Sequence, residues 1–169
     1  MVTAIVNNPG LVAGMVLDWT GAITYRGKKT TGVITRGNLL VPDTGTSPDS
    51  WKQSPAQGVN YGPFAMCMQT TLSADTEVSV VQGGIVAMVA DGTIEIGKQC
   101  MAATATAGQV IAWTATSVTT TPTGAEVTSA SYDNQKVVGI CLGFADNYNT
   151  TTPTAPVDGD LVAVMLRKV

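Results

Sequence analysis

The C-terminal third of the chain is built from short apolar runs that are separated by turn-forming residues. The runs span residues 107–113, 136–145 and 158–167 and are rich in Val, Ile, Leu and Ala. Apolar runs of this length between turn signals are typical of β-strands. No segment repeats apolar residues with the period of about 3.6 residues that marks an amphipathic helix. The sequence therefore predicts an all-β, mainly β protein that folds as a small β-barrel or β-sandwich.

Length and composition favour one domain with a neutral surface. A chain of 169 residues is long enough to bury a core without disulfides or metals. Only 12% of the residues are charged, so Thr, Ser, Gln, Asn and Gly must cover most of the surface. Such a surface suits a protein that packs against neighbours. We expect an arm or edge strand at residues 1–10 and a single β-rich domain at residues 11–169.

The charge distribution argues against several classes of partner. The formal net charge is -3 and the longest basic stretch is residues 26–29, so the electrostatic footprint of nucleic-acid binding is missing. No apolar run reaches the roughly 18 residues that a membrane-spanning helix needs, and the N-terminus lacks the pattern of a signal peptide. We expect a protein that is made in a cytoplasm and binds neither nucleic acid nor membranes.

The chain contains no histidine, which removes the commonest general base and metal ligand. Ser-His-Asp and Cys-His catalysis and His-ligated zinc are therefore excluded. Asp91, Asp158 and Asp160 adjoin glycines, where Asp serves turn geometry. Glu77 and Glu95 occupy strand positions that we expect to face solvent. The sequence predicts no catalytic residue, no metal, no cofactor and no small-molecule substrate.

The three cysteines, each inside an apolar run, and two of the tryptophans are expected in the core. Cys67, Cys100 and Cys141 are odd in number and far apart, which argues against a disulfide framework or a metal site. Because free cysteine is among the most buried residue types, we expect reduced, buried thiols. Trp19 and Trp113 lie in or beside apolar runs and are expected in the core as well.

The segment from Pro42 to Pro63 holds four of the eight prolines and has neither a helical nor a strand period. We therefore expect a long loop at residues 42–63, and such loops inside compact domains are commonly functional. The loop contains Trp51 and Tyr61. Each of these aromatic side chains either anchors the loop against its own domain or contacts a partner.

Two further segments, residues 114–128 and 147–156, are rich in Thr and Pro. Because β-branched Thr beside Pro favours extended backbone, we expect exposed, non-helical loops. The second segment contains Asn149 followed by two threonines, which is the pattern of an N-glycosylation acceptor. That pattern has meaning only in a glycosylating host.

Residues 85–96 carry the clearest local signal. Two apolar runs, 85–90 and 93–96, flank the pair Asp91-Gly92, which suits the two-residue type I′ turn of a β-hairpin. We therefore predict a tight hairpin here. Residues 98–107 are rich in small side chains and fit one helical turn or a loop equally well.

Three of the strand-like segments share features with a family of viral proteins. Residues 107–113 begin with Ala-Gly and end with Trp, residues 137–145 contain two glycines, and residues 158–166 open with Asp-Gly-Asp. In this order they resemble the capsid decoration, or capsid cement, proteins of tailed phages and related viruses. The predicted hairpin is similar to the central part of that family, so the resemblance covers residues 76–169.

The resemblance implies a small β-barrel or β-sandwich, often a homotrimer, that sits on the outside of the shell near local three-fold axes. It implies that the partners are the major capsid protein and further copies of this chain, and it implies no enzymatic activity. Such a protein stabilises the shell by bridging neighbouring major capsid subunits. The expected location is therefore the exterior of the virion, after synthesis in the host cytoplasm.

The residues expected to contact these partners lie in two places. Val2, Ile5 and Val6 are candidate anchors of an N-terminal arm that adds a strand to a neighbour's sheet, although the same segment also suits an ordinary first strand. Trp51 and Tyr61 are the candidates in the long loop. Weak contacts repeated over a lattice strengthen one another through multivalency.

Other classes of function also fit these residues. One is a non-catalytic β-sandwich binding module for carbohydrate or a receptor, in which exposed aromatic residues form a flat platform. Another is a structural virion protein elsewhere, such as a tail or head-completion protein. The third is an enzyme that acts through carboxylates, and the spacing of the carboxylates does not support it.

Overall fold

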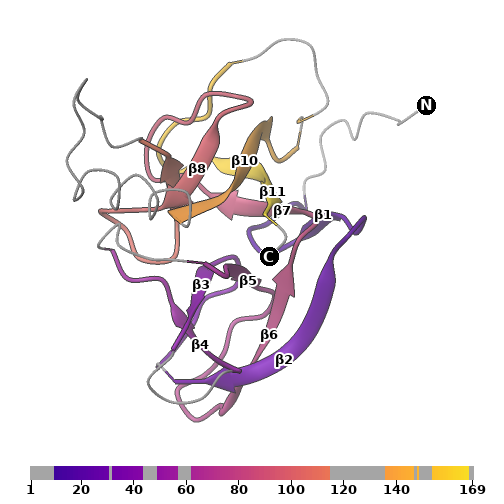
Figure 1. Cartoon of the computed structure of the whole chain (residues 1–169), viewed down its shortest axis with the longest axis vertical. Coiled ribbons are helices and arrows are strands. Elements are labelled where there is room, and N and C mark those ends of the chain that lie inside the picture. The colour runs from indigo at the N-terminus through magenta and orange to yellow at the C-terminus, as the bar shows by residue number, and fades with distance from the viewer. Residues whose placement is uncertain are drawn as a thin grey trace, which may run out of the picture.

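Figure 1 shows the computed structural model, which describes residues 10–30, 32–43, 49–56, 62–114, 136–146, 148 and 154–167. Within these ranges the chain forms eleven β-strands and no α-helix. The predicted all-β class with a small barrel is therefore confirmed. The strands are β1 (Val16–Asp18), β2 (Ile23–Lys29), β3 (Leu39–Pro42), β4 (Ser50–Gln53), β5 (Ala65–Cys67), β6 (Glu77–Gln82), β7 (Ile85–Val89), β8 (Gln99–Ala102), β9 (Val110–Ala112), β10 (Val137–Phe144) and β11 (Leu161–Leu166).

The strands form two units that lie at opposite ends of the molecule (Figure 1). Five strands close a barrel in the order β2-β4-β3-β5-β6, and six form a sheet in the order β1-β7-β11-β10-β8-β9. Strands β2 and β4 pair in parallel, whereas the pairs within the sheet are antiparallel. A further bridge joins Ala90, just after β7, to Val110 of β9, so the six-stranded sheet curls toward closure.

The barrel and the six-stranded sheet share one core, because alternate side chains of the barrel strands point toward the sheet. Successive residues of a strand point to opposite faces. In β3, Leu39 and Val41 therefore point to the six-stranded sheet, while Leu40 points into the barrel. The main core contains Leu39, Val41, Phe64, Met66 and Val81 from the barrel side and Val86, Met88, Ala90, Ile94, Cys100, Ala102, Val110, Val138, Cys141, Val162, Val164 and Leu166 from the sheet side. The barrel core contains Ile34, Leu40, Trp51, Ala65, Cys67, Val78 and Val80.

The expectation of one long loop at residues 42–63 is wrong, because β4 lies within this segment. This strand pairs with β2 and with β3 and thereby completes the barrel. Its Trp51 is only 4% exposed and packs in the barrel core, with its ring centroid 6.2 Å from that of Tyr25. A strand of four residues shows too little alternation to be recognised, and distant strands supply its pairing. Trp51 thus anchors the segment to its own domain.

The predicted hairpin at residues 85–96 is also wrong, because β7 pairs with β1 and β11 and residues 93–96 form no strand. Asp91 and Gly92 do make a bend, in which Gly92 has a φ of 117°. However, the Asp91 carboxylate accepts backbone N–H groups of Ala105 and Thr106 at 3.2 and 3.1 Å. The chain then leaves the sheet, and the Ile94 N–H donates to the Pro156 carbonyl at 3.0 Å.

The structure corrects one of the expected core residues and confirms others. Trp19 is 58% exposed in the turn between β1 and β2, so the expectation that it lies in the core is wrong. A turn residue points away from both sheets even when the strands beside it are apolar. Trp113 is half-buried after β9. Cys67, Cys100 and Cys141 are free and buried, as predicted.

Other local expectations can be compared with the structure. In the segment 98–107, residues 99–102 form β8, and residues 104–107 form bends and a turn, so the loop alternative holds only for the second half. Glu77 and Glu95 are exposed, as predicted. Asp160 serves local geometry, as predicted, since its carboxylate accepts the Val157 N–H at 2.8 Å. The Asp91 carboxylate instead binds residues 105–106, which are distant in the sequence. The expected arm at residues 1–9, Tyr61, Asn149, residues 115–128 of the first Thr-rich loop and most of the second lie outside the described residues.

Candidate interaction surface

The six-stranded sheet has an outward face that is almost entirely apolar. Along β7 and β11, alternate residues point into the main core, and the residues between them point outward. The outward residues pair across these strands: Ile85 with Met165, Ala87 with Ala163, and Val89 with Leu161. We call the following set the apolar face: Ile85, Ala87, Val89, Met101, Ile111, Ile140, Leu161, Ala163 and Met165.

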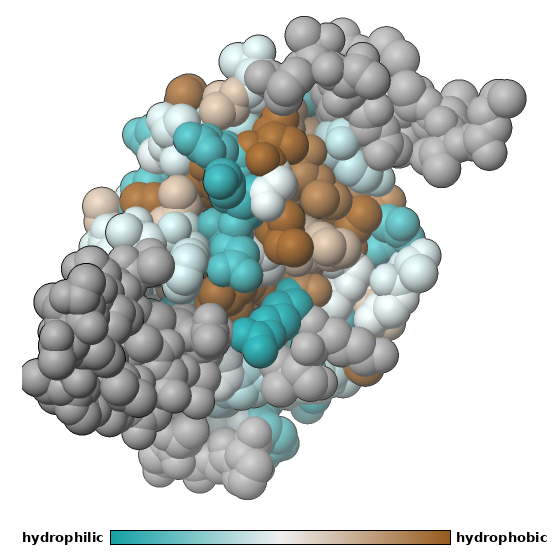
Figure 2. Space-filling view, turned by 45° about the horizontal axis from the view of Figure 1, so that its top comes forward, coloured by the Kyte–Doolittle hydropathy of each residue, from teal (hydrophilic) through white to brown (hydrophobic). Residues whose placement is uncertain are grey.

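The apolar face differs sharply from the outer wall of the barrel. Asp18 is the single charged residue within the six strands of the sheet. On the barrel, the outward positions of β2 and β6 include Arg26, which pairs with Ser79, and Lys28, which pairs with Glu77. An outward sheet face in water normally carries polar side chains. Figure 2 shows the hydrophobic area between hydrophilic surroundings on the end of the molecule where the sheet lies.

The apolar face is exposed to different degrees. Met165 is 42% exposed, whereas the small residues Ala87 and Ala163 are fully buried. At the centre of the face, a methyl group on Gly143 would lie 3.4 Å from the Ile96 Cδ1 atom and 3.7 Å from the Tyr148 Cα atom. Ile96 and Tyr148 therefore lie next to Gly143, whereas Met165 stays accessible to solvent.

An exposed pair, Trp19 and Ile23, extends this surface at the β1 edge. The side chains are 58% and 50% exposed, and Asp18 beside them pairs with Ile85 of the apolar face. Asp18 Oδ1 accepts the Thr20 N–H at 2.8 Å, and this hydrogen bond lowers the pKa of the carboxyl group. The turn thus has a defined shape that presents an indole ring to solvent.

The turn that carries Trp19 is supported by a second turn, between β6 and β7. Gly83 and Gly84 both have positive φ angles, of 71° and 73°. A methyl group on Gly83 would lie 2.6 Å from the Gly21 carbonyl oxygen, and one on Gly84 would lie 2.7 Å from that of Asp18. Only glycine fits at these two positions, because the backbones of the two turns lie in close contact. The turn that carries the Trp19 indole ring is therefore supported by the backbone of the second turn.

The sequence-predicted contact residues do not form this surface. Trp51 is buried in the barrel core, so the expectation that it contacts a partner is corrected in favour of its anchoring role. Val2, Ile5, Val6 and Tyr61 lie outside the described residues. Trp19, Ile23 and Met165, which the structure exposes, were not among the contact residues expected from the sequence. The pattern Asp-Trp-Thr-Gly between two strand-like runs is nevertheless a turn signal.

The open grooves on the described part of the surface include the following three. Two adjoin one another on the polar wall of the barrel, and the third, of about 650 Å³, is lined by Trp113, Glu95, Lys98 and Gln99 among others. Over the ranges that the structure covers, no three His, Cys, Asp or Glu side chains gather as a metal site requires. In the same ranges no helix is long and apolar enough to span a bilayer.

The segments that resemble decoration proteins fall together in the fold. Residues 107–113, 137–145 and 158–166 contain β9, β10 and β11, and β7 belongs to the same sheet. Comparisons of the chain with profiles of known protein families and with curated protein sequences found no match. The functional assignment must therefore come from the residues and the surface they build.

Proposed function

We propose that this protein is a viral capsid decoration protein that binds the outside of the assembled shell and bridges major capsid subunits. The observation that carries the proposal is the apolar face of the six-stranded sheet, because this sheet is made from the segments that resemble the decoration family. A second support is the difference between the apolar outward face of the sheet and the charged outer wall of β2 and β6. A protein that adheres by one side and faces water on the other needs this asymmetry.

The contact we propose uses Met165 and the accessible large side chains around it, with Trp19 and Ile23 at the rim. Burying apolar area contributes roughly 25 cal/mol per Å² before the entropic cost of association is subtracted. Tryptophan is also among the residues that most often dominate binding energy at interfaces. One such contact is modest, and repetition over a shell lattice multiplies its effect.

We further propose that the shell-bound protein is a homotrimer. Repeated contacts around a three-fold axis let one trimer engage several capsid subunits at once, which raises the effective affinity without new contacts. Chemical cross-linking of shell-bound protein should yield a species of three chains, each of 17.4 kDa. Single chains that never cross-link on a saturated shell would contradict the trimer.

Binding to empty shells tests the proposed function. Purified protein is mixed with shells that lack decoration, and bound protein is measured as its concentration rises. We expect binding that saturates at a fixed number of copies per shell, together with shells that resist heating better. Binding without saturation, or saturation without any gain in heat resistance, would contradict the proposed stabilising role.

A further inference from the structure

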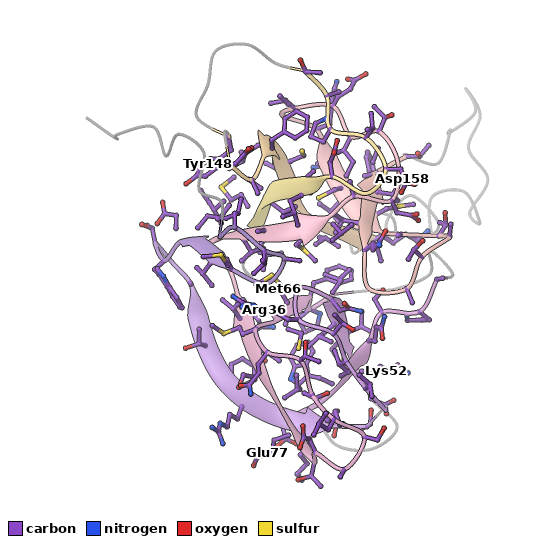
Figure 3. All side chains as sticks on the ribbon, turned by 180° about the vertical axis from the view of Figure 1, so that it is seen from behind. Arg36, Lys52, Met66, Glu77, Tyr148 and Asp158 are labelled. Carbon is purple, nitrogen blue, oxygen red and sulfur yellow. The ribbon has the colours of Figure 1, made fainter. Side chains whose placement is uncertain are left out.

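One stretch of β2 has an unpaired side at the outside of the barrel. Residues 23–28 pair with β6 on one side of the strand, whereas β4 pairs with the other side only at Lys28 and Lys29. In the part of the chain that the structure describes, no strand lies beside residues 23–27 on this second side. Figure 1 and Figure 3, which view the molecule from opposite sides, both show β2 at the outside of the barrel with no strand beyond it. We call residues 23–27 along this side the open edge.

The backbone groups of Thr24 and Arg26 point to the open edge. The Lys29 N–H donates toward the β6 side at 2.9 Å, whereas the Lys28 N–H donates toward the β4 side at 3.0 Å. Because successive residues of a strand direct their backbone groups to opposite sides, residues 24 and 26 share the direction of Lys28. Ser79, the partner of Arg26 in β6, accordingly turns its carbonyl away from β2 and toward the end of β5. Over the described residues, two N–H groups and two carbonyls on the open edge thus have no backbone partner, which is what an added strand uses.

The positive charges beside the open edge are already balanced. The three cations each contact an acceptor: Arg26 with Glu77 at 3.5 Å, Lys28 with Asp49 at 4.0 Å, and Lys29 with the Leu72 carbonyl. A strand without charges can therefore pair here and leave these contacts in place. A basic strand would instead meet three positive charges along the edge.

The side chains of the open edge define the strand that fits beside it. Ile23, Tyr25 and Gly27 share one face of β2, and the Tyr25 ring lies 6.2 Å from that of Trp51. Ile23 is 50% exposed, and Gly27 has no side chain. Cross-strand neighbours pack directly against each other. A matching strand therefore has a small residue opposite Tyr25 and larger apolar residues on either side of it.

Residues 2–6, which lie outside the described ranges, have this pattern. Their sequence is Val-Thr-Ala-Ile-Val, without charge, glycine or proline. In one antiparallel register the run and the open edge form five pairs: Val2–Gly27, Thr3–Arg26, Ala4–Tyr25, Ile5–Thr24 and Val6–Ile23. The smallest residue of the run then faces the largest residue of the edge. Thr3 and Ile5 are the residues that exchange backbone hydrogen bonds with the edge.

We propose that residues 2–6 of one copy add a strand to the open edge of a second copy. This inference rests on the proposed homotrimer, for which it supplies the contact between copies, and it leaves the apolar face free for the shell. An arm that passes from each copy to the next makes a head-to-tail contact, which closes into a ring if the rotation fits. The four residues from Val6 to Gly10 span at most about 14 Å, so the accepting edge lies near Gly10 of the donor.

Disulfide trapping between two separately prepared chains tests this contact. One chain carries Val6→Cys and the other, labelled with ¹⁵N, carries Ile23→Cys. The pair lies between hydrogen-bonded pairs, where Cα atoms about 4.5 Å apart suit a disulfide. The three native cysteines are buried. Leu72→Cys, at a position of the barrel that is 67% exposed, replaces Ile23→Cys in the matched control.

The mixed chains are oxidised both free at about 1 mM, where contacts of millimolar Kd are populated, and on saturated shells. Mass spectrometry then counts the peptides that join the two chains. We expect the disulfide between positions 6 and 23 to be at least about tenfold more abundant than that between positions 6 and 72. Adding Ile5→Pro to the first chain should lower its yield about five- to tenfold, because proline removes an N–H that the pairing uses.

The proposal is overturned if the disulfide between positions 6 and 23 exceeds the control in neither state. It is also overturned if a chain carrying both Val6→Cys and Ile23→Cys closes only within itself, because residues 2–6 would then belong to their own domain. Shell binding without the disulfide contradicts the arm contact alone. The disulfide in free protein that binds no shell supports the arm contact and contradicts the shell role.

Discussion

Two glycines occupy positions where an aromatic ring or a neighbouring backbone leaves no space for a larger residue. Gly27 of β2 lies against Trp51, and Gly139 of β10 lies against the backbone of β11. The indole ring occupies the space that a side chain on Gly27 would need. Sequence reasoning identified Trp51 as either a loop anchor or a partner contact, and the choice depended on β2, which is distant in the chain. The residues next to Trp51 in the sequence could not show which of these two roles it has.

Substituting Gly27 by Ala should destabilise the barrel. The added methyl group would lie 2.3 Å from the Trp51 Cδ1 atom, and the buried ring has no free space to move into. We expect the free energy of unfolding to fall by about 1–3 kcal/mol. Gly32→Ala is the control, because nothing lies within 4 Å of that position and its effect should stay within about 0.5 kcal/mol. Urea denaturation measures both, and equal losses would show that Gly27 does not face the ring.

The buried thiols should make the protein less stable in alkali. Burial raises the pKa of the Cys100 thiol, and the nearby Cys141 raises it further. Unfolded thiols titrate near 9.0, so the unfolded state loses protons first and folding stability declines as the pH rises above 9.0. Each such thiol contributes a slope of up to about 1.4 kcal/mol per pH unit.

Urea denaturation between neutral pH and about pH 10.5 measures this slope. In Cys100→Ala the slope should be shallower than in the unmodified chain, even though the lost side chain lowers stability at neutral pH. An unchanged slope would mean that the Cys100 thiol titrates normally in the folded protein.

At the scale of elements, the sequence predicts strands better than their partners. The apolar runs of β10 and β11 are long enough to be recognised, because these strands carry apolar residues on both faces of the sheet. The Asp-Gly pair at residues 91–92 correctly predicts a bend. It does not predict a hairpin, because the Asp91 carboxylate binds residues 105–106 and directs the following chain away from β7.

Replacing Asp91 by Ala tests this role of the bend. The carboxylate accepts the N–H groups of Ala105 and Thr106 and the Thr106 hydroxyl, the last at 3.0 Å. Losing these hydrogen bonds should lower the free energy of unfolding by about 1–3 kcal/mol. Asp146→Ala, an exposed change after β10, should have an effect within about 0.5 kcal/mol. Thermal unfolding compares the two, and matching melting temperatures would contradict the proposed contribution of Asp91.

At the scale of the whole molecule, the outward face of the six-stranded sheet is apolar, whereas the outward positions of β2 and β6 on the barrel include charged residues. The low charged fraction of the sequence predicts a neutral surface but not its division, because the division depends on which strands share a sheet. The resemblance concerns strands β9, β10 and β11, which lie together in the six-stranded sheet.

The binding of two charge variants to undecorated shells tests the adhesive role of the apolar face most directly. Met165→Glu places a charge on an exposed position of that face, and Thr24→Glu places the same charge on the exposed barrel wall. Both positions reach solvent, so both variants should fold. We expect Thr24→Glu to saturate shells like the unmodified chain and Met165→Glu to bind at least about tenfold more weakly, since the contact would bury an unpaired charge. Equal binding by the two variants, or a loss with Thr24→Glu alone, would contradict the account.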